Sequence, residues 1–297
     1  MRLSKARLRL VGAAGLKLSI PVAYSLLLIP EVGFFFNRYA GFGFDARIYV
    51  RAASEWLSGG DPWSVSIAGV GFVAPPPSLL PFAPFTMLPE SITSVVWVGS
   101  SLAAALFAIR RVGLPLYWLL WPPLLEGIWV GNPNVVVLAF LLLPLGDTPA
   151  AFLKIYAIVP SILLGRWRNV ALTLIALFVT APALPWASFL ADWPRIIGDL
   201  ARQAGPSLNG WVSPLLFVAA TIALALTVRR PWFAVPTLWP SIQAHYGVLA
   251  LPAASGLYGV IAALPIAGAF AWAAIAVSLR DSWKRGRGVP DNPQVLA

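Results

Sequence analysis

Long apolar runs separated by short basic clusters make up most of the chain. A helix that crosses a hydrocarbon core of about 30 Å needs about 20 predominantly apolar residues. Eight runs approach that length: 18–36, 91–109, 114–130, a stretch ending near 164, 170–186, 211–228, 232–251 and 255–279. The pattern predicts an all-α fold, a polytopic transmembrane helix bundle that forms a single domain over residues 1–297.

Two further apolar stretches do not fit this count of eight crossings. Residues 72–89 contain six prolines, and residues 134–145 are too short to cross alone at about 1.5 Å per residue. Both are expected to form broken or re-entrant helices. Irregular backbone is tolerated at membrane depth only where protein or a water-filled cavity surrounds it, so the pattern predicts a cavity that opens to the far side.

Two external loops, about 37–90 and 187–210, are each expected to carry an amphipathic helix. In the first loop, Arg47, Arg51 and Glu55 share one helical face at i, i+4 spacing. In the second, Asp192 is a candidate cap, and charged residues oppose an apolar stripe formed by Trp193, Ile196, Ile197, Leu200 and Ala201. Helices of this kind lie in the interface plane, so both are expected to lie flat on the bilayer.

The charge distribution predicts a topology. The chain has 21 Lys and Arg against 11 Asp and Glu, a formal charge of +10, and a mean hydropathy of +0.79. Basic residues concentrate on the cytoplasmic side of membrane proteins, which places inside the clusters at 2–17, 110–111, 166–168, 229–230 and 280–287. We therefore expect an integral protein of a bacterial plasma membrane, with both termini cytoplasmic, 18–36 as a retained signal anchor, and no nucleic-acid partner.

Few side chains are available for chemistry at the predicted cavity. The absence of cysteine excludes disulfides and thiolate metal sites, and His245 is the only histidine, so neither a metal nor a cofactor is predicted. Asp45 is the first candidate, on the extracytoplasmic side. It is expected to act either as a general base toward an incoming hydroxyl or as the N-cap of the helix that follows, and local sequence favours the cap.

Two charged residues interrupt apolar runs: Lys154 in AAFLKIYAIV and Glu126 in PPLLEGIWVGN. An ionisable residue within a membrane segment is a candidate functional residue. Lys154 could instead extend its ammonium group to the interface. Glu126 could line the cavity close to Asp45, or pair with an arginine for structural reasons.

Several short motifs follow one another in a recognisable order. They are GFDARIYVRAASEWLSGGDPW (43–63), FVAPPPSLLPFAPFTMLP (72–89), GNPN (131–134), Lys154 followed by Pro160 and GRWRN (165–169), GPSLNGWVSP (205–214) and AHYGVLALP (244–252). In this order the chain resembles the lipid-linked-sugar-dependent glycosyltransferases of the C-type fold. The nearest branch is glycosyltransferase family 87, the polyprenyl-phosphate-mannose-dependent mannosyltransferases. The chain departs from that family at Ala74-Pro75-Pro76, usually Tyr-Pro-Pro, and at Gly131-Asn132, often Gly-Gln.

The resemblance implies an inverting, metal-independent transfer of a sugar, mannose in family 87, from a polyprenyl-phosphate donor to a lipid or glycan acceptor. It implies Asp45 as the base, with His245 aiding the base or donating a hydrogen bond to the phosphate. Together with the charge argument for Glu126 and Lys154, the candidate substrate-binding residues are Arg47, Tyr49, Arg51, Glu126, Asn132, Asn134, Lys154, Arg195 and Asn209. The cations would face the departing lipid phosphate, the asparagines sugar hydroxyls and the tyrosine a sugar ring. Each type also has a structural role: headgroup-facing arginines, turn asparagines or a core histidine.

Two other functions are open at this point. Broken helices and an intramembrane lysine also suit a transporter or flippase of lipid-linked saccharides, although the sequence has no clear repeated half. A non-catalytic membrane scaffold is the third possibility. Besides the donor and acceptor, the expected partners are membrane lipids.

Overall fold

The computed structural model describes residues 41–203, 213–239, 243–264 and 266–287, and helices dominate this part of the chain. The elements are α2 Phe44–Leu57, η2 Pro62–Ser64, β1 Ser66–Ile67, β2 Val70–Gly71, η3 Pro76–Leu79, η4 Ala83–Met87, α3 Glu90–Arg111, η5 Leu116–Leu120, α4 Pro122–Trp129, α5 Pro133–Leu141, α6 Asp147–Leu153, η6 Ile155–Ala157, α7 Ile158–Leu163, α8 Trp167–Thr180, η7 Ala181–Ala183, α9 Trp186–Ala191, α10 Trp193–Gln203, α11 Pro214–Leu226, α12 Arg230–Leu238, η9 Ala244–Ala253, α13 Gly256–Ala262 and α14 Ala269–Gly286, where η denotes a 3₁₀ helix. β1 and β2 pair antiparallel, with Ser66 opposite Gly71. The all-α prediction is confirmed.

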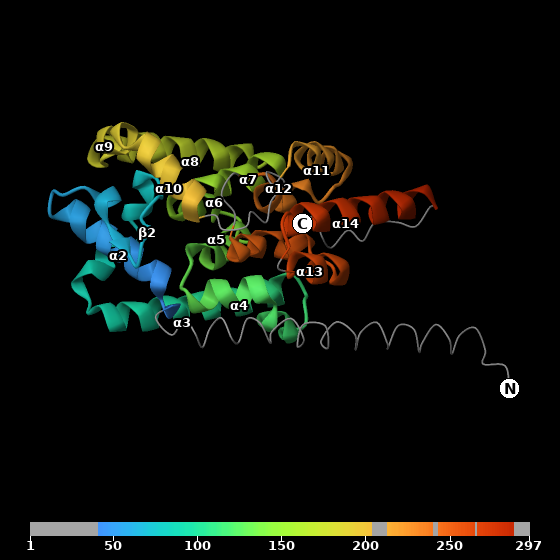
Figure 1. The fold of residues 1–297 in the computed structure, drawn as a ribbon, viewed down its shortest axis with the longest axis horizontal. Helices are drawn as coiled ribbons and strands as arrows, with labels where there is room; N and C mark the ends of the chain where they lie inside the picture. The colour runs from blue at the N-terminus through green and yellow to red at the C-terminus, as the bar shows by residue number, and fades with distance from the viewer. Residues whose placement is uncertain (1–40, 204–212, 240–242, 265, 288–297) are drawn as a thin grey trace.

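Figure 1 shows the arrangement of these elements. α2 lies at one end of the molecule and α14 extends to the other, while α3 and α8 run along opposite edges of the view. The shorter helices α5, α6, α7 and α12 lie between those edges. The predicted first span, 18–36, lies outside the described residues.

One helix in the described part of the chain, α3, is long and apolar enough to cross a membrane. α4 and α5 pass the same test only as a pair, and the pair is bent by 114°. α8, together with η7, and α11 are apolar but shorter than a full crossing. Length and composition therefore support one crossing helix, or two if the bent pair counts as one span.

Four of the predicted continuous spans are wrong. Each of these segments is interrupted and contains two or three separate helices: 114–130, 232–251, 255–279 and the one ending near 164. Proline accounts for much of this, because it removes a backbone donor and clashes with the preceding turn of a helix. Pro122 starts α4 after a break, and Pro236 lies two residues before the end of α12. The expectation of broken structure in 72–89 is confirmed, since that stretch contains only the short 3₁₀ helices η3 and η4 besides extended backbone.

Consecutive short helices form three pairs, and the turns of the first two lie close to α2. The pairs are α4 with α5, α6 with α7, and α12 with η9. The backbone of Asp45 bonds to Val130 in the first turn, and Tyr49 lies against Lys154 in the second. His245, at the start of η9, reaches the first turn through a hydrogen bond to Asn132.

Two arginines hold the other ends of these pairs together. Arg166 donates to the carbonyl of Leu141 at 2.8 Å and to the carboxylate of Asp147 at 3.3 Å, which joins the ends of α5, α6 and α7. Arg229 donates to the carbonyl of Ala253 at 2.6 Å, so η9 returns to the end at which α12 begins. The expectation that 232–251 carries the chain to the opposite side is therefore wrong.

The two amphipathic helices differ in how their apolar faces are covered. α2 buries Ala46, Ile48, Tyr49 and Ala52 inside the protein, where η3 and η4 pack on it. The expectation that this face lies on the bilayer is therefore wrong for α2. The second helix forms as predicted at α10: among its apolar residues Ile196 is buried, whereas Trp193 and Ile197 are 46% and 44% exposed.

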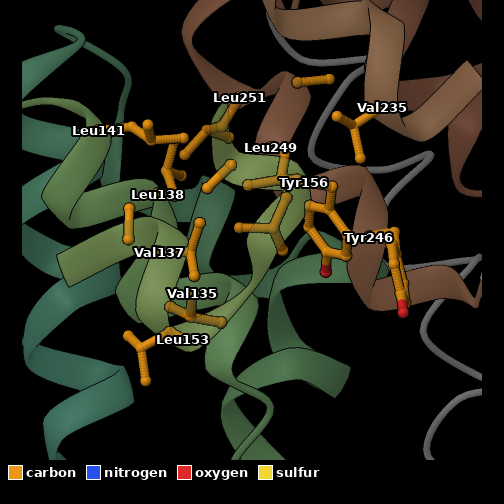
Figure 2. Packing of buried hydrophobic residues seen from close by; sticks show 14 of the residues in the cluster. Val135, Val137, Leu138, Leu141, Leu153, Tyr156, Val235, Tyr246, Leu249 and Leu251 are labelled. Atoms are coloured by element: carbon orange, nitrogen blue, oxygen red, sulfur yellow. The ribbon is translucent and has the colours of Figure 1, made fainter. Parts of the chain in front are cut away.

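α5 lies at the centre of the core. Figure 2 shows its side chains Val135, Val137, Leu138 and Leu141 next to those of η9 and α6. A helix that is apolar on all sides is stable only where neighbours cover it on all sides. Burial therefore holds α5 in place, and with it the turn at its N-terminus.

Candidate active site

Asp45 lies in the first turn of α2 but does not cap it. The N-cap is Gly43, with φ of +64°, and no side chain bonds to the free N–H groups of that turn. The cap role that local sequence favours is therefore wrong. Instead, Oδ2 of Asp45 accepts a hydrogen bond of 2.5 Å from the side-chain amide of Asn132.

The backbone brings these two residues together. The N–H groups of Gly43 and Asp45 donate to the carbonyls of Trp129 and Val130, each at 2.9 Å. The next residue, Gly131, has φ of +65°, and a Cβ there would lie 2.9 Å from Cδ1 of Trp97. Only glycine adopts this conformation readily and leaves this space free, so the turn between α4 and α5 can approach α2.

Asn132 is the centre of a buried polar network. Its Oδ1 accepts from the backbone N–H of Asn134 at 2.9 Å, as the N-cap of α5. Its Nδ2 contacts both Asp45 and Nε2 of His245, the latter at 2.9 Å. An amide nitrogen has two hydrogens, so both are used within the protein. Asn132 is therefore placed to orient Asp45, with no donor left for a sugar hydroxyl.

His245 is 2% exposed and does not contact Asp45 directly. On the side away from Asn132, its Nδ1 lies 3.3 Å from Oε1 of Glu126 in α4. A row of four side chains from four elements thus runs from Asp45 through Asn132 and His245 to Glu126. Glu126 therefore lies close to Asp45 only through His245 and Asn132, and its partner is His245 and not an arginine.

Lys154 lies between α6 and η6, and its side chain reaches α2 at Tyr49. It is 9% exposed, and its Nζ lies 5.1 Å from the ring centre of Tyr49 and 5.9 Å from that of Tyr246. The Asp45 carboxylate is close enough to act on this ammonium electrostatically, although the two form no ion pair within 4 Å. Burial raises the pKa of Tyr49 well above its usual range, so Tyr49 presents a neutral ring and hydroxyl.

Tyr156 and Tyr246 belong to the same cluster, and sequence reasoning gave them no role. Their ring centres are 5.4 Å apart, and the Tyr156 hydroxyl donates to Oδ1 of Asn134. The Nδ2 of Asn134 is buried with no hydrogen-bond partner among the described residues. The available signal was proximity in sequence, because Tyr156 follows Lys154 by two residues and Tyr246 follows His245 directly.

The predicted arginines lie outside this cluster. Arg51 donates to both oxygens of Glu90, at 2.9 and 3.1 Å, and Arg47 lies 3.7 Å from the same carboxylate. Arg195 bonds to Asp192, Asp61 and the carbonyl of Trp63. Asn209 lies outside the described residues. Of the substrate-binding residues that the sequence predicts, the structure brings Tyr49, Glu126, Asn132, Asn134 and Lys154 together with Asp45 and His245.

An apolar groove passes close to this cluster. It has a volume of about 680 Å³ and lies between η3, α3, α5 and α6. Its lining includes Trp97, which touches Gly131, and Leu153, the neighbour of Lys154. In the described residues no group of three or more His, Cys, Asp or Glu side chains could hold a metal ion.

No family model, curated protein or solved structure matches this chain. Its function is therefore inferred from its own residues and from the order of its motifs.

Proposed function

We propose that this protein is an integral membrane glycosyltransferase, and that its donor is a sugar, mannose by the resemblance to family 87, carried on polyprenyl phosphate. The acceptor is the hydroxyl of a lipid or glycan on the extracytoplasmic face. One observation carries the proposal: a carboxylate oriented by a buried amide, Asp45 on Asn132, lies one helical turn from Tyr49, whose ring contacts the buried ammonium of Lys154. A general base next to a fixed cation is what an inverting transfer from a phosphate requires.

The reaction forms one bond and breaks one bond at the anomeric carbon. The acceptor oxygen attacks from the face opposite the phosphate, and its proton passes to Asp45. The C–O bond to the phosphate breaks, and the polyprenyl phosphate leaves with the electron pair. Oδ1 of Asp45 makes no hydrogen bond within the described part of the chain, so it is the oxygen that takes the proton.

The cation for the leaving phosphate is Lys154. Its ammonium has no hydrogen-bond acceptor among the described residues and is held over the faces of two tyrosines. A phosphate oxygen would satisfy its donors, and a charge-assisted bond of this kind contributes about 1.5–3 kcal/mol. The groove beside Leu153 offers apolar surface for the isoprenoid chain of the donor.

The charge distribution supports the proposed orientation in the membrane. Glu90, at the start of α3, bonds to α2, while Arg110 and Arg111 lie at the opposite end of the same helix. Arg166 and Arg229 likewise lie away from the turns that meet α2. With basic residues on the cytoplasmic side, Asp45 faces the extracytoplasmic side.

A transporter of lipid-linked saccharides is the second candidate, because paired half-length helices with polar turns also occur at transport sites. The two functions are separable in proteoliposomes that contain the purified protein, a panel of radiolabelled polyprenyl-phosphate sugars, and membrane lipids as acceptors. We expect a new glycosidic bond and an equal amount of released polyprenyl phosphate. Movement of label across the bilayer without a new bond would favour transport. If neither a new bond nor movement of label is observed, both functions are contradicted.

A further inference from the structure

We infer that Glu126 is a positioning residue: through His245 and Asn132 it fixes the direction of the Asp45 carboxylate, and it holds His245 in the neutral form protonated at Nδ1. The inference rests on the proposed function for the role of Asp45 as base. It changes the part assigned to Glu126, from substrate contact to control of the base. It also makes His245 a hydrogen-bond acceptor at Nε2.

The first step is the orientation of the Asn132 amide. The backbone N–H of Asn134 can only donate, so the atom 2.9 Å from it is the amide oxygen. The other terminal atom of Asn132 is therefore the nitrogen. Both contacts of that nitrogen, to Asp45 and to His245, must be donated by it.

The second step is the protonation of His245. Because Nε2 of His245 accepts from Asn132, the proton of the neutral ring is on Nδ1. Nδ1 faces Oε1 of Glu126 at 3.3 Å, and a carboxylate accepts that proton's hydrogen bond. The remaining neighbour of the ring is Tyr246, whose ring centre is 5.2 Å away. Glu126 therefore determines which nitrogen of His245 faces Asn132 as an acceptor.

The third step is the effect on Asp45. Without Glu126, the imidazole can adopt the other tautomer, with a proton on Nε2 that opposes the Nδ2 hydrogens of Asn132. The amide would then turn or move, and the bond to Asp45 would lose its direction. Glu126, Asn132 and His245 come from α4, the start of α5 and η9, so the relay depends on the packing of two helix pairs.

The single histidine of this chain allows a direct test by NMR. The full-length protein, purified with a histidine-free tag and labelled with ¹⁵N-histidine, gives one imidazole whose nitrogen shifts report the tautomer. We expect the Nδ1–H form in the wild type and a changed tautomer in Glu126→Ala. Glu126→Gln, which keeps an acceptor oxygen, should retain most of the wild-type signal. A wild-type ring protonated at Nε2, or a spectrum indifferent to Glu126→Ala, would overturn the inference.

The same variants are then assayed for sugar transfer. We expect Glu126→Ala to lower kcat by about 10-fold to 100-fold, because a misplacement of about 1 Å at the reacting groups can cost about 100-fold in rate. KM for the donor should change little, and Glu126→Gln should restore most of the rate. Glu55→Ala, on α2, is the control and should change neither the spectrum nor the rate. An unchanged kcat in Glu126→Ala would overturn the positioning role, whereas inactive wild-type protein with the expected spectrum would refute the proposed function.

Discussion

The ammonium of Lys154 lies 5.1 Å from the ring centre of Tyr49, and these residues come from segments 105 positions apart in the chain. The ring faces stabilise a cation by about 0.5–2 kcal/mol, but no group in the described part of the chain accepts a hydrogen bond from its three donors. A buried ammonium in this situation favours an anionic ligand.

Lys154→Met should therefore remove ligand binding and leave the fold intact. Methionine fills similar space without the cost of a buried charge, so we expect no loss of thermal stability in the free protein. The increase in Tm on adding polyprenyl phosphate should fall, because the apparent Kd rises by about 10-fold or more. Arg51→Met, which removes an exposed cation from α2, is the matched control and should keep the wild-type increase. An undiminished increase in Lys154→Met would exclude Lys154 from the phosphate site.

Gly131→Ala should destabilise the turn that carries Asn132. Alanine at φ of +65° costs about 1–2 kcal/mol, and its Cβ would also meet the ring of Trp97. Gly113→Ala isolates the first effect, since Gly113 has φ of +70° with nothing within 4 Å of its Cβ position. We expect Gly131→Ala to lose more unfolding free energy than Gly113→Ala. Only Gly131→Ala should also lose sugar transfer. Equal effects of the two substitutions would show that Trp97 does not crowd this turn.

Asp281 predicts a pH dependence of stability. Burial alone would raise the pKa of its carboxyl, but the hydrogen bonds and charges of Arg229 and Arg280 outweigh burial and hold the pKa below its ordinary value of 3.8. A lowered pKa in the folded state means that this stabilisation is present above pH 3.8 and is lost as the pH falls through the lower folded value.

Thermal unfolding of Asp281→Asn and wild-type protein in detergent tests this. Removing one partner of a buried pair costs about 3–5 kcal/mol, so Asp281→Asn should unfold at a lower temperature at pH 7. The difference from wild type should persist to about pH 4 and shrink below it. A difference that stays constant through this acid range would contradict the pairing, and Glu55→Gln should show no difference at pH 7.

The position of Ala254 predicts a result that differs from the sequence-based topology. Its neighbour Ala253 is bonded to Arg229, so residue 254 should be on the cytoplasmic side. The chain contains no cysteine, so Ala254→Cys introduces a single labelling site. We expect a membrane-impermeant maleimide to label it in inside-out vesicles and not in intact cells. Labelling in intact cells would show instead that 232–251 crosses the membrane completely.

Much of the fold could be predicted from periodicity and composition, but the path of the chain could not. The helical segments 44–57 and 193–203 have amphipathic spacing that favours helix whatever surrounds them. Apolar runs such as 114–130 and 232–251 contain enough residues for a crossing, and hydropathy does not distinguish one long helix from two short ones packed together. Their prolines were the local signal for a break.

The candidate site, too, could be predicted from the sequence only in part. Asp45 and Lys154 could be selected because a charge in or beside an apolar run is costly to bury. The bond between Asn132 and His245 joins residues 113 positions apart, and only the packing of α4 and α5 against η9 brings them together. Arg47 and Arg51 were expected at the phosphate, but their partner Glu90 lies in the next helix, and sequence spacing does not indicate that contact.

The proposed chemistry depends on the Asp45 carboxylate as the group that takes the acceptor proton. Asp45→Asn keeps the size of the side chain, and Glu55→Gln makes the same carboxylate-to-amide change three turns along α2. The deciding measurement is the initial rate of sugar transfer from a defined polyprenyl-phosphate sugar by folded, membrane-inserted protein of each variant. We expect a loss of about 100-fold or more in Asp45→Asn and a wild-type rate in Glu55→Gln. A wild-type rate in Asp45→Asn would contradict the role of Asp45 as the base.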